Sequence, residues 1–482
     1  METDDAQAAT IRLWSLRQDV LVEVGAGDES LVVVTRWGEF DLGGADRVVR
    51  EALRRMRLGP ISLENVTAGT GNAEDTDVAY PGRAELEKVL DQLSGSVVHS
   101  LGLRDGQAPL LSLIPVVKAP EFRPEPVPGG APVRLSRFAT IRPDGGALVL
   151  ESPASRFTVS LGGQAAVRVV TALAAPVSIA EIGARSGIDG RVVADIVAYL
   201  TAAGVALVGD GRAGFAEDED PALRSWSHHE LAFHRKSRTR QGDGPVDMAP
   251  ATDAQPPIVK PVPPGRTVAL PRPAPGRTGH GEPGLTALLE TDHTCPEFSG
   301  DGLSLRELGE LLFRAARIRS IGPGHLPFGP GHEASQRPYF NVACLYELEV
   351  YLSIDRCTGL DRGIYHYDPL GHALTLVNDD RTDLAEMLDM AKVAAGSVPR
   401  PAALLSVTAR PGRTSWALGG AAYATALAHF GALQQTLYLV AKAMGLAVHA
   451  VPVDDCDTVG RALGLDWPAE IGVGECVLDR ES

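Results

Sequence analysis

Alternating hydrophobic and polar positions occur as paired runs at two places in the first part of the chain. Residues 19–24 alternate and are followed by a second run at 31–35, while residues 139–142 are followed by 147–150. The turn inside the later pair, 143–146, has the sequence Pro-Asp-Gly-Gly, and Asp-Gly between alternating runs is typical of a β-hairpin. The pattern therefore predicts two antiparallel hairpins.

The segments after the two hairpins also resemble each other. Phe-Asp-Leu-Gly-Gly-Ala at 40–45 corresponds to Phe-Thr-Val-Ser-Leu-Gly-Gly at 157–163, and Pro-Ile-Ser-Leu at 60–63 corresponds to Pro-Val-Ser-Ile at 176–179. Helical spacing of apolar residues follows in both copies, and the second copy ends in a predicted strand at 205–208. Strands, three helices and a closing strand are typical of a winged helix-turn-helix module.

We therefore predict a chain of four parts. The linker is indicated by residues 241–283, which hold 11 of the 35 prolines and almost no long apolar residues. Such a segment cannot bury a core, so we expect it to run extended across a surface or between domains. The predicted parts are a first winged-helix-like module at 1–125, a second at 133–215, an entry helix with the proline-rich linker at 225–283, and a C-terminal domain at 284–482.

Clear helix and strand patterns appear in the C-terminal domain. Ser304 and Glu307 form the start of a capping box, and the apolar stripe that follows predicts an amphipathic helix. A loop rich in Gly, Pro and His at 322–332 is expected to be either a mobile lid over a site or a solvated crossing. Residues 363–369 and 372–376 are predicted to form a hairpin.

Two further elements are predicted near the C-terminus. The uncharged stretch 414–441 predicts a long helix that continues to Lys442 and ends at Gly445, where glycine serves as the cap. Because it contains His429 and other polar residues, we expect a helix buried inside a protein rather than one that crosses a membrane. Residues 472–478 predict the last strand.

Composition and charge narrow the classes of function. The chain has 482 residues, with 45 Lys and Arg against 61 Asp and Glu, which gives a net charge of -16. Nucleic acid is therefore an unfavourable partner, because duplex binding requires basic neutralisation of phosphates. The N-terminus lacks the pattern of a secretory signal, and the five cysteines include no Cys-x-x-Cys pair, so we expect a cytoplasmic protein without a disulfide framework or a metal site.

Seven segments resemble, in order, the SagB-type dehydrogenases, which are flavin enzymes of the nitroreductase fold that oxidise azolines in ribosomally synthesised peptides. The second module resembles the peptide-clamp domains related to the PQQ-biosynthesis chaperone, in which a leader peptide adds a strand to a sheet edge. A structural or dimerising role for both modules is the alternative, and a DNA-binding role ranks behind both because of the charge. The seven segments are residues 231–238, 304–317, 337–351, 363–369, 415–423, 431–446 and 464–466.

The resemblance implies an α+β domain that dimerises through its long central helix. It also implies flavin mononucleotide (FMN) bound between two chains, in a homodimer or in a heterodimer with a paralogue. The implied reaction removes a carbon-bound proton and a hydride from a thiazoline or oxazoline and gives the azole. The implied partners are a precursor peptide and a YcaO-type cyclodehydratase complex. The residues that the resemblance assigns to the cofactor are Thr294, Arg337, Asn341, Val342, Ala343, Trp416 and Gly420.

Three places depart from the family pattern. Where the family has arginines that hold the flavin phosphate, residues 292–296 are Asp-His-Thr-Cys-Pro, and only Thr294 can replace the serine hydroxyl of the family. The acid Asp292 in this stretch would repel a phosphate. Peptide-oxidising members carry Lys-Tyr where this chain has Ala-Leu at 417–418. The glycine-rich turn that faces the flavin is replaced by Phe-Asn-Val-Ala at 340–343.

Two hypotheses about function follow, and a transcription factor with a flavoprotein-like sensor domain ranks third. In the first hypothesis, the chain is an active FMN-dependent dehydrogenase whose flavin phosphate is held by Arg337, Arg235 or Arg238. No catalytic residue is assigned; the base would be Tyr423, His429 or a lid histidine, although His429 on an apolar helix face fits a core residue better. In the second hypothesis, the chain is a catalytically silent subunit that binds peptide, or that completes a site with an active paralogue.

Overall fold

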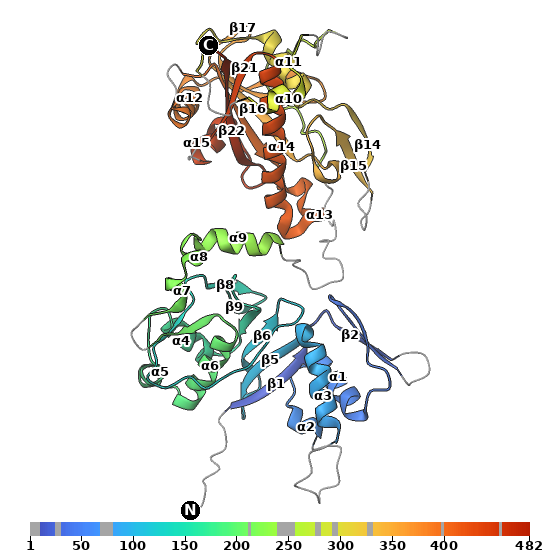
Figure 1. Ribbon diagram of the computed structural model, residues 1–482, viewed down its shortest axis with the longest axis vertical. Helices are drawn as coiled ribbons and strands as arrows, with labels where there is room; N and C mark the ends of the chain where they lie inside the picture. The colour runs from blue at the N-terminus through green and yellow to red at the C-terminus, as the bar shows by residue number, and fades with distance from the viewer. Residues whose placement is uncertain are drawn as a thin grey trace, which may run out of the picture. The chain divides into compact units, whose positions relative to one another are not determined.

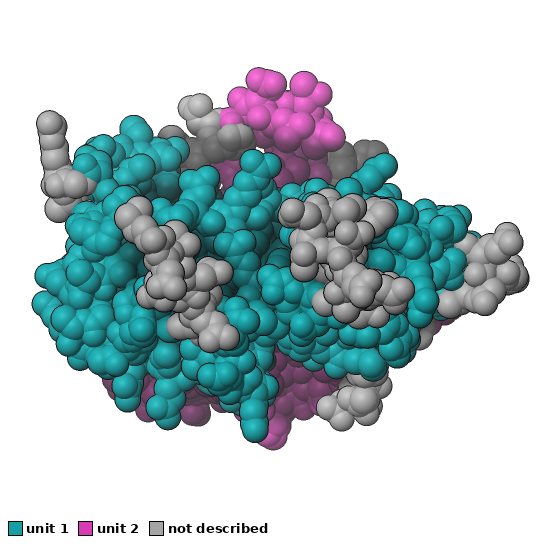
Figure 2. All heavy atoms as spheres, turned by 90° about the horizontal axis from the view of Figure 1, so that it is seen from below, with its two compact units in different colours: residues 1–247 teal, residues 248–482 magenta. Residues whose placement is uncertain are grey.

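The computed structural model divides the chain into two compact units, residues 1–247 and 248–482 (Figure 1, Figure 2). The second unit begins before the predicted domain start at residue 284, because the described part of the linker pairs with its sheet. The residues described are 10–24, 30–67, 81–210, 214–238, 256–274, 281–291, 297–324, 331–396, 400–452 and 456–482.

Antiparallel strands form the centre of the first unit. One sheet has the order β1-β5-β6-β10-β9-β8, a smaller one has the order β2-β3-β4, and β7 pairs with β11. The hairpins β2–β3 and β8–β9 confirm the two predicted ones. Gly145 and Gly146 both have the positive φ that the second two-residue turn requires. The strands are β1 (Thr10–Leu16), β2 (Leu21–Val24), β3 (Leu31–Thr35), β4 (Gly38–Asp41), β5 (Val97–Leu103), β6 (Pro109–Pro115), β7 (Val133–Leu135), β8 (Thr140–Asp144), β9 (Ala147–Glu151), β10 (Phe157–Leu161) and β11 (Ala206–Val208).

The helices of the first unit follow its strands in a repeated order. A hairpin, a third strand and three helices succeed one another as β2-β3-β4-α1-α2-α3 and again as β8-β9-β10-α4-α5-α6. Ser178 begins α5 with a capping box to Glu181, and Gly187 ends it in the left-handed conformation. The winged-helix interpretation of this repeat stays a prediction. The helices are α1 (Arg47–Leu58), α2 (Leu63–Thr67), α3 (Pro81–Gln92), α4 (Gln164–Ala172), α5 (Ile179–Ser186), α6 (Gly190–Ala202), α7 (Ala216–Glu219), α8 (Pro221–Arg224) and α9 (His228–Arg238), with the 3-10 turn η1 (Ser94–Ser96).

One sheet joins the two halves of the first unit. β6, from the predicted first module, pairs with β10 of the second, so that Leu113 lies opposite Val159. The hydrophobic core around α4–α6 accordingly contains Leu111 and Leu113 together with Val197. The hairpin β5–β6 thus packs with the second half, although it lies in the residues assigned to the first. A strand pairing between distant segments of this kind is not visible in local sequence patterns.

The second unit is built around a seven-stranded antiparallel sheet with the order β12-β19-β18-β16-β20-β22-β21. It confirms the α+β class, including the predicted hairpin β18–β19 and the last strand β22. The strands are β12 (Thr267–Ala269), β13 (Leu303–Ser304), β14 (Ser320–Gly324), β15 (His332–Gln336), β16 (Leu348–Ile354), β17 (Cys357–Thr358), β18 (Gly363–Asp368), β19 (Ala373–Asn378), β20 (Ala403–Ala409), β21 (Leu446–Val451) and β22 (Ile471–Arg480).

Helices cover both faces of this sheet. On one face, α11 and α14 pack against alternate residues of β16 such as Val350 and Leu352, while α12 packs on the opposite face against Tyr351. The capping box of Ser304 and Glu307 begins α11 as predicted. The helices are α10 (Leu285–Leu289), α11 (Leu305–Ala315), α12 (Arg381–Ala395), α13 (Ser415–Leu418), α14 (Ala422–Ala443) and α15 (Cys456–Leu463), with the 3-10 turns η2 (Val342–Cys344), η3 (Pro411–Arg413) and η4 (Gly419–Ala421).

Two predicted elements differ from the structure. The predicted loop at 322–332 begins and ends in paired strands, β14 and β15, and residues 325–330 lie outside the described residues. The long helix begins at Ala422 rather than Thr414, because Gly419 adopts φ 49° and separates it from the short α13. The lid and the role of α14 in dimerisation stay predictions. No helix among the described residues is long and apolar enough to cross a membrane.

We expect the contact between the linker and α11 to be sensitive to a single methyl group. A Cβ added to Gly309 would lie 2.7 Å from the backbone oxygen of Pro271, so Gly309→Ala is expected to lower the free energy of unfolding by about 1–3 kcal/mol. Gly460 in α15 is the matched control, since a Cβ there meets nothing within 4 Å. Gly460→Ala should stabilise by about 1 kcal/mol through helix propensity. Urea denaturation of the full chain measures both; equal effects would contradict the close linker contact.

Candidate functional site

Three neighbouring parts of the second unit carry most of the residues assigned to the cofactor. Arg337 follows β15, residues 341–343 belong to the turn before β16, and Trp416 lies in α13. His332 joins these parts, because its Nε2 lies 3.0 Å from the backbone oxygen of Ala343 and its ring lies 5.6 Å from that of Trp416. The structure thus brings these predicted residues together.

Other candidates from the sequence are not part of this group. Gly420 lies exposed in η4, and Thr294 and Asp292 are outside the described residues. Arg235 and Arg238 belong to α9 of the first unit, where Arg235 donates to a backbone oxygen of that unit. Their roles toward a flavin phosphate stay predictions.

The turn before β16 has an unusual backbone. Ala343, Cys344 and Tyr346 have φ values of 54°, 57° and 44°, in the left-handed region that L residues rarely adopt. Each such residue costs on the order of 1 kcal/mol or more and persists only where the surroundings hold it. Part of that support is local, since the side-chain oxygen of Asn341 accepts the Tyr346 backbone N–H at 3.0 Å.

The side chain of His429, in α14, also holds the turn before β16 in place. Its Nε2 accepts the backbone N–H of Val342 at 2.8 Å, so Nε2 carries no proton and Nδ1 does. Nδ1–H donates to Glu347 at 2.6 Å, and the second oxygen of Glu347 accepts from the Asn341 amide at 3.0 Å. Both ring nitrogens are therefore occupied, which agrees with the interpretation of His429 as a satisfied core residue.

Glu347 is a completely buried carboxylate in this cluster. Burial raises the pKa of Glu347, but the hydrogen bonds from His429 and Asn341 outweigh burial, so that its pKa lies below the ordinary value. Glu347 is therefore ionised near neutral pH, so the cluster of Asn341, Glu347 and His429 contains a buried negative charge. The sequence analysis missed this residue, because its partner His429 is 82 positions away.

His332 lies in the segment predicted as a lid or a solvated crossing, and it differs from His429 because one of its ring nitrogens has no partner among the described residues. A carbonyl oxygen only accepts, so His332 donates from Nε2 to Ala343 and Nδ1 carries a lone pair. Nδ1 is buried and has no hydrogen-bond partner among the described residues. Tyr423, the other predicted candidate, is 45% exposed in α14. Among the candidate bases, His332 is thus the one whose ring nitrogen keeps an unshared lone pair.

Three buried arginines beside the turn bind the linker. Arg410 donates to Pro257 at 2.8 Å, Arg413 donates to Pro256 at 2.9 Å, and Arg337 donates to Ile258 at 3.4 Å, in each case to a backbone oxygen. Burial, with the nearby charge of Arg410 acting in the same direction, lowers the pKa of Arg413 to about 10. Carbonyl oxygens of the linker thus partly compensate a concentration of positive charge inside the unit.

These contacts test whether the assigned residues fit an FMN phosphate. Arg337 is 6% exposed, and its guanidinium is bonded to oxygens of the interior. The N–H of Val342 is given to His429, and the Asn341 side chain is bonded at both its oxygen and its nitrogen. The negative charge of Glu347, in the same cluster, would in addition repel the phosphate. These residues therefore do not fit a flavin phosphate in the arrangement of the single chain.

A buried polar network on the other face of the sheet was also missed by the sequence analysis. Glu470 accepts from Tyr351 at 3.0 Å and from Thr408 at 2.6 Å, and it forms an ion pair with Lys260 of the linker. Burial raises the pKa of Tyr351, so its hydroxyl stays protonated and donates. The sequence signal that could have indicated this network is the alternation of polar residues along β16. No group of three His, Cys, Asp or Glu side chains in the described residues could hold a metal ion.

We expect the hydrogen bond between Glu347 and His429 to contribute strongly to the free energy of unfolding. We expect His429→Ala to lower the free energy of unfolding by about 3 kcal/mol, because it leaves a buried carboxylate short of a donor. In a double-mutant cycle with Glu347→Gln, the coupling energy is expected to exceed about 1 kcal/mol. The exposed pair Arg83 and Glu87 in α3 is the control, with an expected coupling below about 1 kcal/mol. Additive effects at Glu347 and His429 would contradict the bond.

Glu475 of β22 should give stability a distinct pH dependence. Burial raises its pKa from 4.5 to about 7, so between these values the folded chain holds a proton that the unfolded chain has lost. Stability therefore falls as pH rises through this window, by an amount on the order of 3 kcal/mol. Glu475→Gln should remove the fall, whereas Glu297→Gln at an exposed site should keep it. Urea denaturation at pH 5 and pH 7 measures the difference.

Comparison with known proteins gives one match to a family. Residues 133–243, which include β7 to α9 of the first unit, match the family model of the cyanobactin oxidase ThcOx. The chain is also similar to a protein of Methanocaldococcus jannaschii described as a nitroreductase, at 24% identity over 167 residues, which cover 35% of this chain and 77% of that protein.

Solved structures with some similarity are a nitroreductase from Ralstonia eutropha and a microcin synthetase complex. The first has 20% identity and a TM-score of 0.35, and the match covers 46% of this chain and 97% of that one. The second is the Escherichia coli McbBCD complex with truncated pro-MccB17 bound, with 20% identity, a TM-score of 0.34, and coverage of 43% and 77%. Scores at this level do not establish a common fold. The match of residues 133–243 to the ThcOx family model and the similarity to a nitroreductase confirm the resemblance predicted from the sequence, whereas the winged-helix interpretation stays a prediction.

Proposed function

We propose that this chain is the dehydrogenase-like subunit of a system that matures a ribosomally synthesised peptide. In this proposal it binds the precursor peptide and, together with a second chain, completes the site where thiazoline or oxazoline rings are oxidised to azoles. The observation that carries the proposal is the closed turn before β16: His429 occupies the Val342 N–H, and Glu347 occupies the Asn341 amide. The match of residues 133–243 to the ThcOx family supports the peptide as substrate.

Exposed apolar residues support a second chain at this site. Phe340 is 71% exposed and Val342 is 36% exposed, both next to the ring of His429, and Tyr423 is exposed at the start of α14. Large apolar side chains left exposed together are typical of an interaction surface. The second chain would be either another copy or a dehydrogenase paralogue. A YcaO-type cyclodehydratase complex would supply the azoline-containing peptide.

The chemistry requires a proton acceptor and a hydride acceptor. Conversion of an azoline to an azole breaks two bonds to hydrogen, one as a proton and one as a hydride. In this chain the Nδ1 lone pair of His332 is the group best placed to take the proton, and Nε2–H bonded to Ala343 keeps the ring oriented. The hydride acceptor would be FMN bound chiefly by the second chain.

A second candidate function is FMN-dependent azoline oxidation by this chain without a paralogue. The similarity to a nitroreductase favours it, and so does the retention of the predicted framework from α11 to α14. For this function, His429 would have to release the Val342 N–H, and the phosphate would need cations other than the inward-bonded Arg337.

Colour distinguishes the two candidates. Purified alone, the chain is expected to be colourless and to stay so after incubation with FMN and desalting, because the assigned residues are bonded to one another. Co-expressed with a neighbouring dehydrogenase paralogue, it should purify as a yellow complex whose flavin absorbance bleaches on reduction. In that complex, His332→Gln should reduce azole formation without loss of flavin absorbance, whereas Tyr423→Phe should have little effect.

A yellow, reducible chain purified alone would support the second candidate and contradict the proposal. A complex that contains flavin but forms no azole on any azoline peptide tested would contradict the proposal, and a yellow single chain that forms none would contradict the second candidate.

A further inference from the structure

A cavity between helix α9 and the six-stranded sheet of the first unit, the α9 cavity, has a volume of about 480 Å³. Strands β6, β8 and β10 line one side of it, and α9 with the turn between β3 and β4 lines the other. All of its lining residues belong to one compact unit, so the cavity exists within the single chain. Cavities of about 300–1,000 Å³ are the size that small organic ligands occupy in proteins.

The α9 cavity lies on the face of the sheet that is turned away from the core helices. Side chains alternate between the two faces along β10, where Val159 and Leu161 belong to the core with α4–α6. Thr158 faces the other way and lines the cavity, as does Ile114, which lies opposite Thr158 on β6. Strands β6 and β10 are paired on both sides. At these two strands the cavity therefore offers side chains to a ligand and no open backbone edge.

Helix α9 covers the cavity and is held there by polar contacts. None of its residues is buried. At its start, His228 Nε2 lies 2.8 Å from the hydroxyl of Thr140. Near its end, Arg235 donates to the backbone oxygen of Ser155 at 3.3 Å. A helix that buries no side chain gains little from the hydrophobic effect, so the space beneath it is not filled by a core.

Positive charge exceeds negative charge in the lining of the α9 cavity. The cation Arg17 is matched by Asp19 at 3.0 Å, and it also donates to the backbone oxygen of Pro115. The remaining charged side chains leave an excess of two positive charges, although the whole chain has a net charge of -16. These side chains are the cations Arg36, Arg142, Arg235 and Lys236 and the carboxylates Asp144 and Glu151.

The two carboxylates lie together at one end of the cavity. Arg142 forms ion pairs with Asp144, at 3.1 Å, and with Glu151. Arg36 and Arg235 come from other elements, the turn after β3 and the helix α9, and both are half-buried. Partly buried guanidinium groups attract an anion more strongly than exposed ones, because water screens them less. The part of the cavity beside Arg36 and Arg235 therefore favours an anionic group.

Apolar side chains complete the lining beside these cations. Ile114 and Val116 of β6 are half-buried on the sheet side, and Pro153 follows β9. On the helix side, Phe233 is 38% exposed and lines the cavity. An apolar wall with a few charged groups is typical of a site for a small molecule that has both an apolar body and a polar end.

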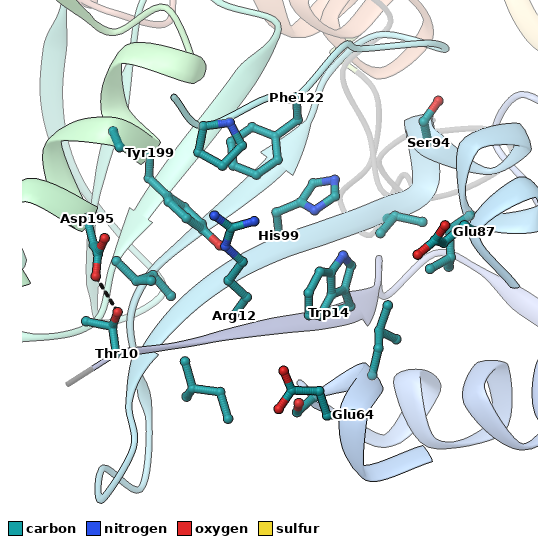
Figure 3. Close-up of a pocket in the computed structure, with 18 of the residues that line it drawn as sticks. Thr10, Arg12, Trp14, Glu64, Glu87, Ser94, His99, Phe122, Asp195 and Tyr199 are labelled. Atoms are coloured by element: carbon teal, nitrogen blue, oxygen red, sulfur yellow. Dashed lines mark hydrogen bonds between the residues drawn. The ribbon is translucent and has the colours of Figure 1, made fainter. Parts of the chain in front are cut away.

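A larger groove of the same unit, with a volume of about 830 Å³, lacks the excess of positive charge (Figure 3). Figure 3 shows Glu64, Glu87 and Asp195 around this groove, with Arg12 on β1. Its complete lining contains four carboxylates and three arginines. Of the two cavities, the α9 cavity is therefore the one whose charges suit an anion.

We propose that the α9 cavity binds a small molecule that joins a phosphate monoester to an apolar body. The phosphate pairs with Arg36 and Arg235, because guanidinium groups present paired N–H donors that match phosphate oxygens. Its double negative charge equals the excess of positive charge in the lining. The apolar body packs between Phe233 and the side chains of β6. A bound ligand thus ties α9 to the rest of the first unit, at a site that the proposed function does not use.

The test uses the full chain and isothermal titration calorimetry with 1-naphthyl phosphate, which joins a dianionic group to a flat apolar body. We expect a dissociation constant below about 1 mM. Inorganic phosphate lacks the body and 1-naphthol lacks the charge, so each is expected to bind at least about tenfold more weakly. The cation 1-naphthylmethylamine should not bind. A ligand held at this strength is lost on desalting, so the colour test of the proposed function is unaffected.

Substitutions separate the charged part of the cavity from its apolar part. Arg36→Gln and Arg235→Gln, on two different elements, should each weaken 1-naphthyl phosphate about tenfold. Phe233→Ala should weaken 1-naphthyl phosphate but leave the binding of inorganic phosphate unchanged. Arg168 of α4, exposed and outside the lining, is the control, and Arg168→Gln should bind like the unchanged chain. Circular dichroism establishes that each variant is folded.

Hydrogen exchange provides a second measurement. Saturation with 1-naphthyl phosphate should slow exchange of the backbone amides of α9 and leave those of α3, which does not line the cavity, unchanged. No binding of 1-naphthyl phosphate, equal binding of 1-naphthol, or binding that neither arginine variant changes would overturn the inference.

Failure of the α9 cavity and failure of the proposed function are distinguishable, because the titration requires neither flavin, a paralogue nor turnover. A complex that forms azoles, from a chain that does not bind 1-naphthyl phosphate, would overturn the cavity alone. Binding that both arginine variants weaken would support the cavity even if no complex forms azoles.

Discussion

The hydrogen bond from His429 to Glu347 is the interaction on which the site of the second unit depends. A fully buried carboxylate requires donors, and it has two here, from His429 and the Asn341 amide. Once Nδ1 of His429 donates, its Nε2 can only accept, and it takes the N–H of Val342. One imidazole thus joins α14 to a strained turn and to the start of β16. The same bond explains why the turn is directed inward instead of offering its N–H groups to a ligand.

The proline-rich linker provides the second constraint. Buried guanidinium groups need acceptors, and the linker supplies backbone oxygens at Pro256, Pro257 and Ile258 to Arg413, Arg410 and Arg337. Proline suits this role, because it offers a carbonyl but has no N–H that would need its own partner inside the protein. Low apolar content, from which the sequence analysis predicted a segment extended across a surface or between domains, is therefore compatible with a segment that is held by polar contacts.

The separation of interacting residues along the chain decides which features could be predicted from the sequence. The hairpin with the Asp-Gly turn and the capping box at Ser304 depend on neighbours within a few positions, and both were predicted. The pairing of β6 with β10, and that of Glu347 with His429, join segments far apart in the chain, which leave no local pattern. Gly419 interrupts a continuous apolar run, and only its backbone conformation shows that the helix begins later. The structure brings several of the cofactor candidates together, but the hydrogen bonds among them could not be foreseen from the sequence.

The two compact units divide the proposed work between binding and chemistry. The segment that matches the ThcOx family lies within the first unit, whereas Arg337, the turn at 341–343 and Trp416 lie in the second. In the first unit, β6 pairs with β10, so the two halves share one sheet whose outer strands are β1 and β8. A duplicated fold whose two copies share one sheet can therefore keep only its outer edges for a further strand.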